Sequence, residues 1–409
     1  MACGRRESKV LRRGTHRSQA LEQSLARALR LAPILGITRV ANVTGLDTVG
    51  IPVVMVCRPN SRSVAVSQGK GIDLASARVS GLMESAELYH AETITAPLRL
   101  ATYEELRYQH DVVDVDTLPR TSVSRFHPNL RLLWCEGLDL LSGEIVLVPY
   151  EMVHTCCSIP MPDGHGCFAA SSNGLASGND AMEAISHGIC EVVERDANTV
   201  WSLRPEEKQD ENRLDLASVD DELCQEIIGK FENAGLAVAV WDITSDIGIA
   251  AFACCIVPQQ EGAMWHPSVD WGHGCHPDRQ VALLRALTEA AQTRLTLISG
   301  LRDDFGRETY GQLLDPDVAK AIRQRILASA PTRRFQDISH WDGETLEEDV
   351  EWELSCLSKA GITRVVAVDL TKTEFGLPVF RVVIPGLEAI LESGYVPGRR
   401  GRAALAPEP

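Results

Sequence analysis

The stretch SSNGLASGNDAMEAISHGICEVVERDA, residues 171–197, decides the fold, because a helix with two contrasting faces begins inside it. A run of small residues and glycines ends at Asn179-Asp180, and apolar residues then recur at helical spacing to about Asp196. At about 100° per residue, one face is polar and carries Glu183, His187, Glu191 and Glu194. The opposite face is apolar and carries Met182, Ile185, Ile189, Val192 and Val193. We therefore expect one side of the helix to be core and the other to be acidic.

The acidic face has two interpretations. Solvated helix faces usually mix charges, because Glu and Lys four residues apart stabilise a helix and like charges repel. Between Ser171 and Glu194 there is no Lys or Arg, so the stripe of carboxylates indicates a divalent cation as its neutralising partner. Asp180 and Glu183 also match a capping box, which gives Glu183 a purely structural alternative.

The composition limits the classes of function. A chain of 409 residues with 44% hydrophobic and 23% charged residues is typical of a globular protein with one large core or two domains. Its net charge of -16 argues against nucleic acid as a partner, because phosphate contacts need a basic surface. The longest apolar run, around Ile247 to Val257, is too short to cross a bilayer, so we expect no membrane association. Twelve cysteines without a CxxC pair or a secretory signal predict reduced thiols in the cytoplasm.

The order of predicted elements favours an α+β fold made of mixed two-layer α/β sandwich units. Predicted strands and helices alternate, but no strand is followed by a GxGxxG turn, which disfavours a Rossmann sheet. We expect residues 1–13 to be a basic, disordered arm and residues 396–409 to be a flexible tail.

Two more segments repeat the polar spacing of the first helix. In SQGKGIDLASARVSGLMESAELYHAE, residues 67–92, a Gly69-Lys70-Gly71 turn precedes a second predicted helix, and such a turn can hold phosphate at a helix N-terminus. A third helix is predicted from about Arg279 to Leu297. The same 4,3 spacing of polar residues occurs in Ser80-Glu84-Glu87, His187-Glu191-Glu194 and Arg285-Glu289-Gln292. Three such ladders favour a shared site over coincidence, although any single one is common in amphipathic helices.

The residue types at these positions suit a site for ATP and Mg²⁺ between the helices. Carboxylate oxygens are ligands that Mg²⁺ prefers, and the bound ions in turn bind polyphosphate. The predicted ligands are Glu84, Glu87, Glu191 and Glu194. Arginines balance phosphate charge, and the candidates are Arg17, Arg195 and Arg285. The expected chemistry is phosphoryl transfer, in which positioning and electrostatics supply most of the catalysis.

The three segments closely resemble the signature blocks of the YcaO family, and the resemblance extends from about Gly14 to Glu388. It implies an ATP-dependent catalytic domain over residues 14–395, with a core at 59–395. Members of this family are similar in using ATP and Mg²⁺ to activate a peptide-bond oxygen. A nucleophile adds to the carbonyl, the oxyanion is phosphorylated, and loss of phosphate leaves an azoline or a thioamide.

The resemblance also implies roles for individual residues. Glu84, Glu87, Glu191 and Glu194 would bind metal and, with Arg195, form the catalytic set. The residues that would bind nucleotide are Arg17, Ser24, Lys70, Ser80, Asn179, Glu183, His187, Arg195 and Arg285. Two positions depart from the family pattern: Leu88 replaces an Arg that often follows the second Glu, and His187 stands where some members have Gln.

The C-terminus lacks the PxPxP ending typical of azoline-forming members, since the chain ends Ala406-Pro407-Glu408-Pro409. Together with the ELYHAE and PGLE segments, this makes the chain look more like members encoded with a TfuA partner, which resemble thioamide synthases. We therefore expect a precursor peptide or protein as substrate, a TfuA-type partner, a sulfide donor and a homodimer. Azoline formation and an accessory role in ribosomal protein methylthiolation stay open. Sulfide relay is a minor hypothesis for Cys275, in a glycine-flanked loop, and for Cys156-Cys157.

Overall fold

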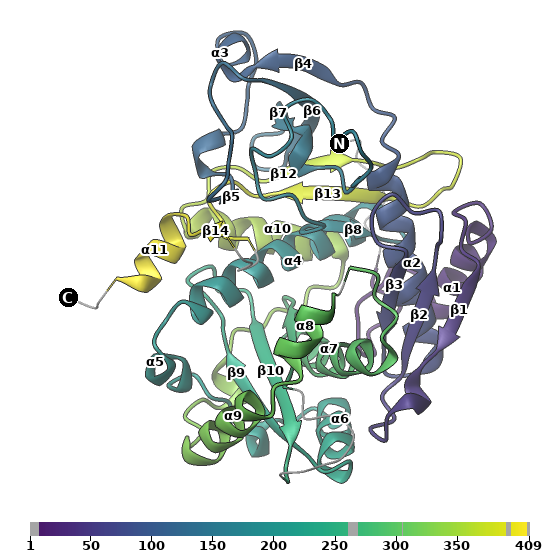
Figure 1. Ribbon diagram of the computed structural model, residues 1–409, viewed down its shortest axis with the longest axis vertical. Coiled ribbons are helices and arrows are strands. Elements are labelled where there is room, and N and C mark those ends of the chain that lie inside the picture. The colour runs from purple at the N-terminus through teal and green to yellow at the C-terminus, as the bar shows by residue number, and fades with distance from the viewer. Residues whose placement is uncertain (1–7, 261–268, 305, 390–393, 407–409) are drawn as a thin grey trace.

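The computed structural model describes residues 8–260, 269–304, 306–389 and 394–406. Within these ranges the strands form four sheets, and every pairing between named strands is antiparallel. Figure 1 shows one sheet at the top, one at the bottom and one at the right, with helices lying between them. The predicted α+β fold is confirmed.

The sheet at the right of Figure 1 has the strand order β1–β2–β3. Its strands are β1 (Arg39–Asn42), β2 (Val53–Cys57) and β3 (Val66–Lys70). Helix α2 (Leu74–Glu92) covers one face, and α1 (Leu21–Leu31) packs against α2.

The lower sheet has the order β9–β10–β11. Its strands are β9 (Leu236–Asp242), β10 (Ala251–Pro258) and β11 (Asp270–Cys275). Every residue of β10 is buried, because helices cover both of its faces. The helices around this sheet are α5 (Glu206–Asp210), α6 (Glu222–Asn233), α7 (Arg279–Ser299), α8 (Arg307–Leu313) and α9 (Pro316–Ala328).

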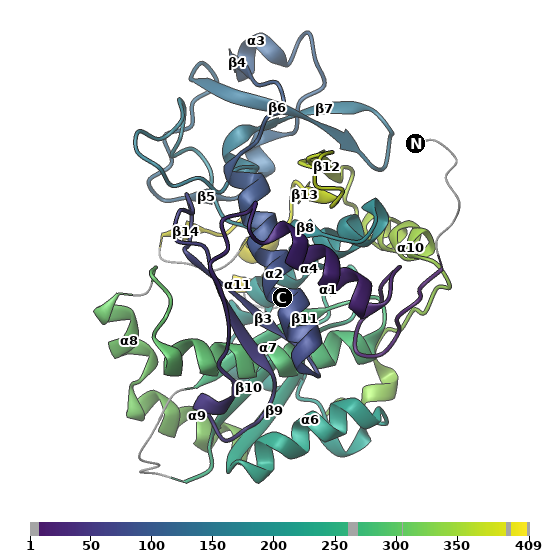
Figure 2. The same cartoon turned by 90° about the vertical axis from the view of Figure 1, so that its right-hand side faces the viewer.

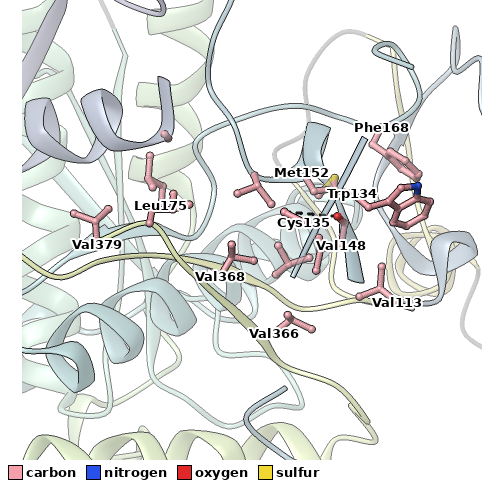
Figure 3. Packing of buried hydrophobic residues seen from close by; sticks show 14 of the residues in the cluster. Val113, Trp134, Cys135, Val148, Met152, Phe168, Leu175, Val366, Val368 and Val379 are labelled. Atoms are coloured by element: carbon pink, nitrogen blue, oxygen red, sulfur yellow. Dashed lines mark hydrogen bonds between the residues drawn. The ribbon is translucent and has the colours of Figure 1, made fainter. Parts of the chain in front are cut away.

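The upper sheet has the order β4–β6–β12–β13–β8, and β7 pairs with β6. Its strands are β4 (Arg99–Thr102), β6 (Arg131–Asp139), β7 (Ile145–Pro149), β8 (Leu175–Ser177), β12 (Val366–Asp369) and β13 (Val379–Val383). Short helix α3 (Tyr103–Leu106) follows β4. Figure 3 shows the apolar core on one face of this sheet, where Trp134, Val148 and Val366 are fully buried. A core of this size fixes the position of β13 and β8, which border the site described below.

Three helices connect the sheets. α2 contacts β3 and β8, while α4 (Ala181–Ser202) contacts β8 and β13 above and β11 below. α7 contacts β11 and β3. Figure 2 shows α2 running between the upper and lower parts of the molecule, and α10 (Leu346–Lys359) packs beside α4. The three helices that carry the polar ladders are therefore the ones on which the sheets converge.

The Gly69-Lys70-Gly71 segment is not a turn at a helix start, and that prediction is wrong. Gly69 and Lys70 belong to β3, and α2 begins only at Leu74, after Asp73 caps the backbone N–H of Ser76. A Cβ on Gly69 would lie 2.0 Å from the carbonyl oxygen of Ala77 and 2.2 Å from the nitrogen of Gly81. Glycine is therefore needed there because the strand crosses α2 at backbone contact, a tertiary reason that local sequence does not contain.

Both chain ends differ from the expected disorder over the residues that the structure describes. Lys9 is buried, and its Nζ lies 2.8 Å from Oδ2 of Asp349. Residues 399–405 form helix α11, in which Arg400 Nε lies 2.8 Å from Oδ1 of the fully buried Asp196. Tyr395 and Val396 also pair, as β14, with β5 (Arg120–Thr121). Ion pairs with residues distant in sequence thus order both of these polar segments. Among the described helices, none has the length and apolar character needed to span a bilayer.

We predict that Gly69→Ala lowers the free energy of unfolding by about 1–3 kcal/mol, because the added methyl group forces β3 away from α2. Gly229→Ala in α6 is the matched control, since nothing lies within 4 Å of a Cβ there and replacing a helical glycine stabilises by about 0.5–1 kcal/mol. Urea unfolding of both variants measures the difference. Equal stability of the two variants would contradict close packing of β3 on α2.

Candidate functional site

Helix α4 begins as the sequence predicts, with Asp180 as its N-cap. The Asp180 side chain accepts a hydrogen bond from the Glu183 backbone N–H at 3.0 Å. The reciprocal half of a capping box is not formed, because the Glu183 carboxylate faces the N-terminal segment and Asn179 instead. Only one of the two hydrogen bonds of a capping box is therefore formed. The Glu183 carboxylate is available for another role.

The Glu183 carboxylate connects α4 to the N-terminal element. Its Oε1 accepts from Arg17 Nη1 at 2.8 Å, and its Oε2 accepts from the Ser18 backbone N–H at 3.0 Å. Asn179 Nδ2 donates to both oxygens at 3.1 Å, and Ser24 Oγ donates to Asn179 Oδ1 at 2.8 Å. Burial raises the pKa of Glu183, but the Arg17 charge and these hydrogen bonds outweigh it and hold the pKa below its ordinary value. Four of the predicted nucleotide residues thus form one network.

The four predicted metal ligands extend from two facing helices. Glu84 and Glu87 lie on α2, and Glu191 and Glu194 lie on α4. Glu84 Oε2 accepts from the Gln68 backbone N–H at 3.2 Å. Glu87 Oε1 accepts from the backbone N–H and Oγ of Ser177 at 2.9 and 2.6 Å. Strands β3 and β8 therefore hold the two α2 carboxylates by one oxygen each.

These carboxylates lie close enough to affect one another's ionisation, and we call the region between them the acidic cleft. The pKa of Glu84, Glu87 and Glu191 is raised to about 7 each, with burial as the largest cause. Repulsion adds to it: Glu191 raises the pKa of Glu84, Glu84 raises that of Glu87, and both Glu194 and Glu87 raise that of Glu191. The charge of Arg195 opposes the shift at Glu191 without cancelling it. A partly buried acidic cleft with too little positive charge is a site that a divalent cation stabilises.

Basic groups line the α7 side of the cleft. Arg195 Nη1 lies 3.6 Å from Glu194 Oε1, and Lys70 Nζ forms an ion pair with Glu289 of α7. Arg285 Nη2 donates to His187 Nε2 at 3.0 Å. Burial and then the Arg285 charge hold the pKa of His187 well below its ordinary value, so the ring is a neutral acceptor. Ser80 Oγ accepts from the Lys70 backbone N–H at 3.4 Å.

Glu289 was not among the assigned site residues, although the structure places it in the cleft. Its carboxylate contacts Lys70 Nζ and accepts from the His273 backbone N–H at 3.2 Å. Burial raises the pKa of Glu289, but the Lys70 charge, the His273 hydrogen bond and the Arg195 charge outweigh it and hold it well below its ordinary value. The signal was present in the sequence, because Glu289 stands at the same ladder position as Glu84 and Glu191.

The donor set fits Mg²⁺ by its chemistry. Within the described part of the chain no group of three or more His, Cys, Asp or Glu side chains is close enough, as the side chains stand, to hold a metal ion. Glu84 and Glu87 nonetheless each keep one carboxylate oxygen free of hydrogen bonds from described residues. Because Glu side chains rotate readily, reorientation of these oxygens toward Glu191 and Glu194 is all that such a site requires.

The predicted relay role of Cys275 does not agree with its position. Cys275 ends strand β11 and is fully buried, so it does not lie in a loop. Contact with Cys275 and burial raise the pKa of the Cys190 thiol well above its ordinary value. Cys157 is exposed, but burial of its thiol group raises its pKa as well. None of these shifts favours a thiolate.

Comparison with known proteins identifies the family of this chain. The sequence profile of a family described as YcaO cyclodehydratase, ATP- and Mg²⁺-binding, matches residues 68–388. The chain belongs to the YcaO family. The expectation of ATP and Mg²⁺ as cofactors is thereby confirmed at the level of the family.

Two relatives cover nearly the whole chain. A protein from Rhizobium leguminosarum bv. trifolii, described as an uncharacterized protein in the tfuA 3' region, is 38% identical over 88% of this chain and 86% of its own length. An uncharacterized protein from Methanothermobacter thermautotrophicus is 32% identical over 91% of this chain and 95% of its own.

Solved structures show the same fold. The YcaO protein from Methanopyrus kandleri, bound with AMPPCP and Mg²⁺, superposes with a TM-score of 0.73 at 24% identity and covers 93% of this chain and 94% of its own. A heterocyclase in complex with substrate and cofactor superposes with a TM-score of 0.78 at 21% identity over 97% of this chain. This chain spans only 55% of that heterocyclase.

The raised carboxyl pKa values predict how stability depends on pH without metal. A carboxyl whose pKa is raised by folding binds its proton more tightly in the folded state, so its contribution to stability is lost as pH rises from its ordinary 4.5 to about 7. Without Mg²⁺ we expect Glu191→Gln to raise the free energy of unfolding at pH 8 by about 1–3 kcal/mol. At pH 4 the variant should be no more stable than the parent protein.

Urea unfolding at the two pH values, with chelator present, measures this difference. The exposed Glu232→Gln in α6 is the control and should change stability little at either pH. Saturating Mg²⁺ at pH 8 should reverse the order and favour the parent protein. A Glu191→Gln variant that is less stable than the parent at pH 8 without metal would contradict the charge repulsion described here.

Proposed function

We propose that this protein uses ATP and Mg²⁺ to activate a peptide backbone amide by O-phosphorylation and installs a thioamide in a ribosomally made peptide or protein. The observation that carries the proposal is the set of carboxylates on α2 and α4, Glu84, Glu87 and Glu191, whose charges raise one another's pKa values. When bound, Mg²⁺ and ATP supply charge neutralisation and the phosphoryl group that converts the amide oxygen into a leaving group.

The chain's own residues have separate tasks in this proposal. Glu84, Glu87, Glu191 and Glu194 hold the metal ions through their oxygens. The Glu183 network and Arg17 orient the nucleotide, because they form a rigid set of hydrogen-bonding groups between the N-terminal segment and α4. Ser24 and Asn179 fix the geometry of that set. The residues that we place next to the phosphates of the bound nucleotide, called the phosphate side, are Lys70, Ser80, His187, Arg195, Arg285 and Glu289.

The charge on the phosphate side limits where the phosphates lie. Lys70 and Arg195 are neutralised in part by Glu289 and Glu194, so they keep their positions in the absence of nucleotide. Phosphate oxygens then find preorganised cations, and little reorganisation is needed during the transfer. Arg285 provides a further donor next to the neutral ring of His187.

Two features favour a thioamide over an azoline. The relative described as lying in the tfuA 3' region supports a TfuA-type partner for this chain. Helix α11 is anchored to α4 through Arg400 and Asp196. In Figure 1 α11 lies at the left, at the far end of α4 from α2. Residues 399–405 therefore do not extend toward the carboxylates.

The alternative product is an azoline made by cyclodehydration, which the family description and the likeness to a heterocyclase favour. An ATP-binding accessory factor for ribosomal protein methylthiolation is a third candidate, since it needs the same nucleotide site. We propose a precursor peptide or protein, a TfuA-type partner and a second copy of the chain as the assembly in which the reaction occurs.

Nucleotide binding tests the site directly. With Mg²⁺ and AMPPCP at about 100 times Kd we expect a stabilisation of about 2.7 kcal/mol. Glu191→Ala should abolish most of it, because one metal ligand and its charge are lost, whereas the exposed Glu232→Ala should keep it. Thermal unfolding with and without ligand measures both. An unchanged shift in Glu191→Ala would rule out the carboxylate site.

Product mass separates the two chemistries. We expect a modified peptide to gain about 16 Da when sulfur replaces the amide oxygen, whereas cyclodehydration loses about 18 Da. Intact-mass measurement on a peptide treated with the protein, ATP, Mg²⁺, sulfide and the TfuA-type partner decides between them. A loss in mass that persists without sulfide would contradict thioamide formation.

A further inference from the structure

Arg381 of β13 is a buried cation without adequate partners. Its side chain is 1% exposed, and its only hydrogen bond to a described residue joins Nη2 to the Ser171 carbonyl oxygen at 2.7 Å. Nε and Nη1 are buried without a partner. A guanidinium carries five N–H donors and a permanent charge, and leaving them unsatisfied inside a protein costs free energy. We therefore expect either a ligand that pairs with the Arg381 guanidinium or a function that requires its buried charge.

The guanidinium lines a small cavity beside the acidic cleft. Met152, Ser171, Asn173 and Val192 contribute to its wall, and its volume is about 20 Å³. A cavity of that size accommodates one or two water-sized groups. The Asn173 side-chain oxygen is also buried without a partner. The unsatisfied donors of the cavity are therefore those of Arg381, and a half-turn of the Asn173 amide would add N–H donors to them.

The charge of the cavity depends on Glu191. Val192 lines the cavity while its neighbour Glu191 faces the carboxylate cleft, so one turn of α4 borders both. Burial lowers the pKa of Arg381 to about 10, and the Glu191 charge opposes this. A small anion in the cavity would pair with the Nε and Nη1 donors of Arg381 that the described residues leave unsatisfied.

We propose that the Arg381 cavity binds hydrosulfide, the sulfur nucleophile of the reaction. The proposal rests on the proposed function, because only a thioamide-forming enzyme needs this anion. Hydrosulfide has a single heavy atom and a full negative charge, and it therefore matches the donors and the volume.

The chemistry of this step balances without an oxidant or a reductant. The hydrosulfide sulfur forms a bond to the amide carbon, and the amide C–O bond breaks as the oxygen leaves with the phosphoryl group. The proton of hydrosulfide is released and ends on phosphate, which leaves a C=S bond. Sulfur keeps its oxidation state throughout. Arg381 holds the nucleophile on the α4 side of the carboxylates until the amide is in place, which makes it a substrate-binding residue.

Anaerobic thermal unfolding tests the proposal on the full chain saturated with Mg²⁺ and AMPPCP. Sodium hydrosulfide is compared with sodium chloride and sodium phosphate at equal ionic strength and pH, in the presence of a phosphine reductant. We expect hydrosulfide alone to raise the melting temperature in a saturable way. Replacing the charge in Arg381→Met should raise the half-saturating concentration by about tenfold or more, because a charge-assisted hydrogen bond is lost. Arg381→Lys should restore part of the response.

The rise in melting temperature that Mg²⁺ and AMPPCP cause in Arg381→Met distinguishes a failure of this proposal from a failure of the proposed function. If that shift is intact and hydrosulfide gives no more stabilisation than chloride in the parent protein, the cavity proposal is overturned while the nucleotide site stands. An equal response to hydrosulfide in Arg381→Met, or a response to phosphate in its place, also overturns it. If Arg381→Met does not fold, Arg381→Lys is compared with the parent protein: a higher half-saturating hydrosulfide concentration supports the proposal, and an equal one overturns it.

Discussion

Repulsion between partly buried carboxylates is the constraint on which the site depends. Burial, as the largest cause, and the charges of neighbouring carboxylates together raise the pKa of Glu84, Glu87 and Glu191 to about 7 each. Helices that carry such groups separate unless other contacts hold them together. The backbone contact of β3 with α2 at Gly69 and the packing of α4 under β8 and β13 supply those contacts. The fold therefore holds carboxylates close together although their charges repel one another, and a bound divalent cation reduces that repulsion.

The basic side chains of the site pair with individual carboxylates but do not neutralise the whole acidic cluster. Arg195 and Lys70 each face a carboxylate, Glu194 and Glu289, and so stay in place without ligand. On the other side, Arg17 and Glu183 join the N-terminal segment to the start of α4. Phosphates and metal ions then add charges of opposite sign to a framework that is already fixed, which is the arrangement that electrostatic catalysis requires.

Much of this was visible in the sequence. The ladder of Glu191 and Glu194 predicted both the helix and its acidic face, because helical periodicity and the absence of counter-charges are local properties. The phosphate-binding turn at Gly69 was a wrong prediction, since its glycine serves contact between a strand and a helix. The flexible tail was wrong for a similar reason: the pairing of Arg400 with Asp196 joins residues that are distant in sequence. Arg381 lies in an apolar strand, and its buried position depends on the whole sheet.

The central claim is that α2 and α4 together provide the metal ligands. A crystal structure of the full chain with Mn²⁺ and AMPPCP, read by anomalous scattering, tests it most directly. We predict anomalous peaks within about 2–2.3 Å of carboxylate oxygens from both helices, Glu84 or Glu87 on one and Glu191 or Glu194 on the other. Nucleotide bound with its metal ions ligated by only one of these helices, or elsewhere in the molecule, would contradict the account.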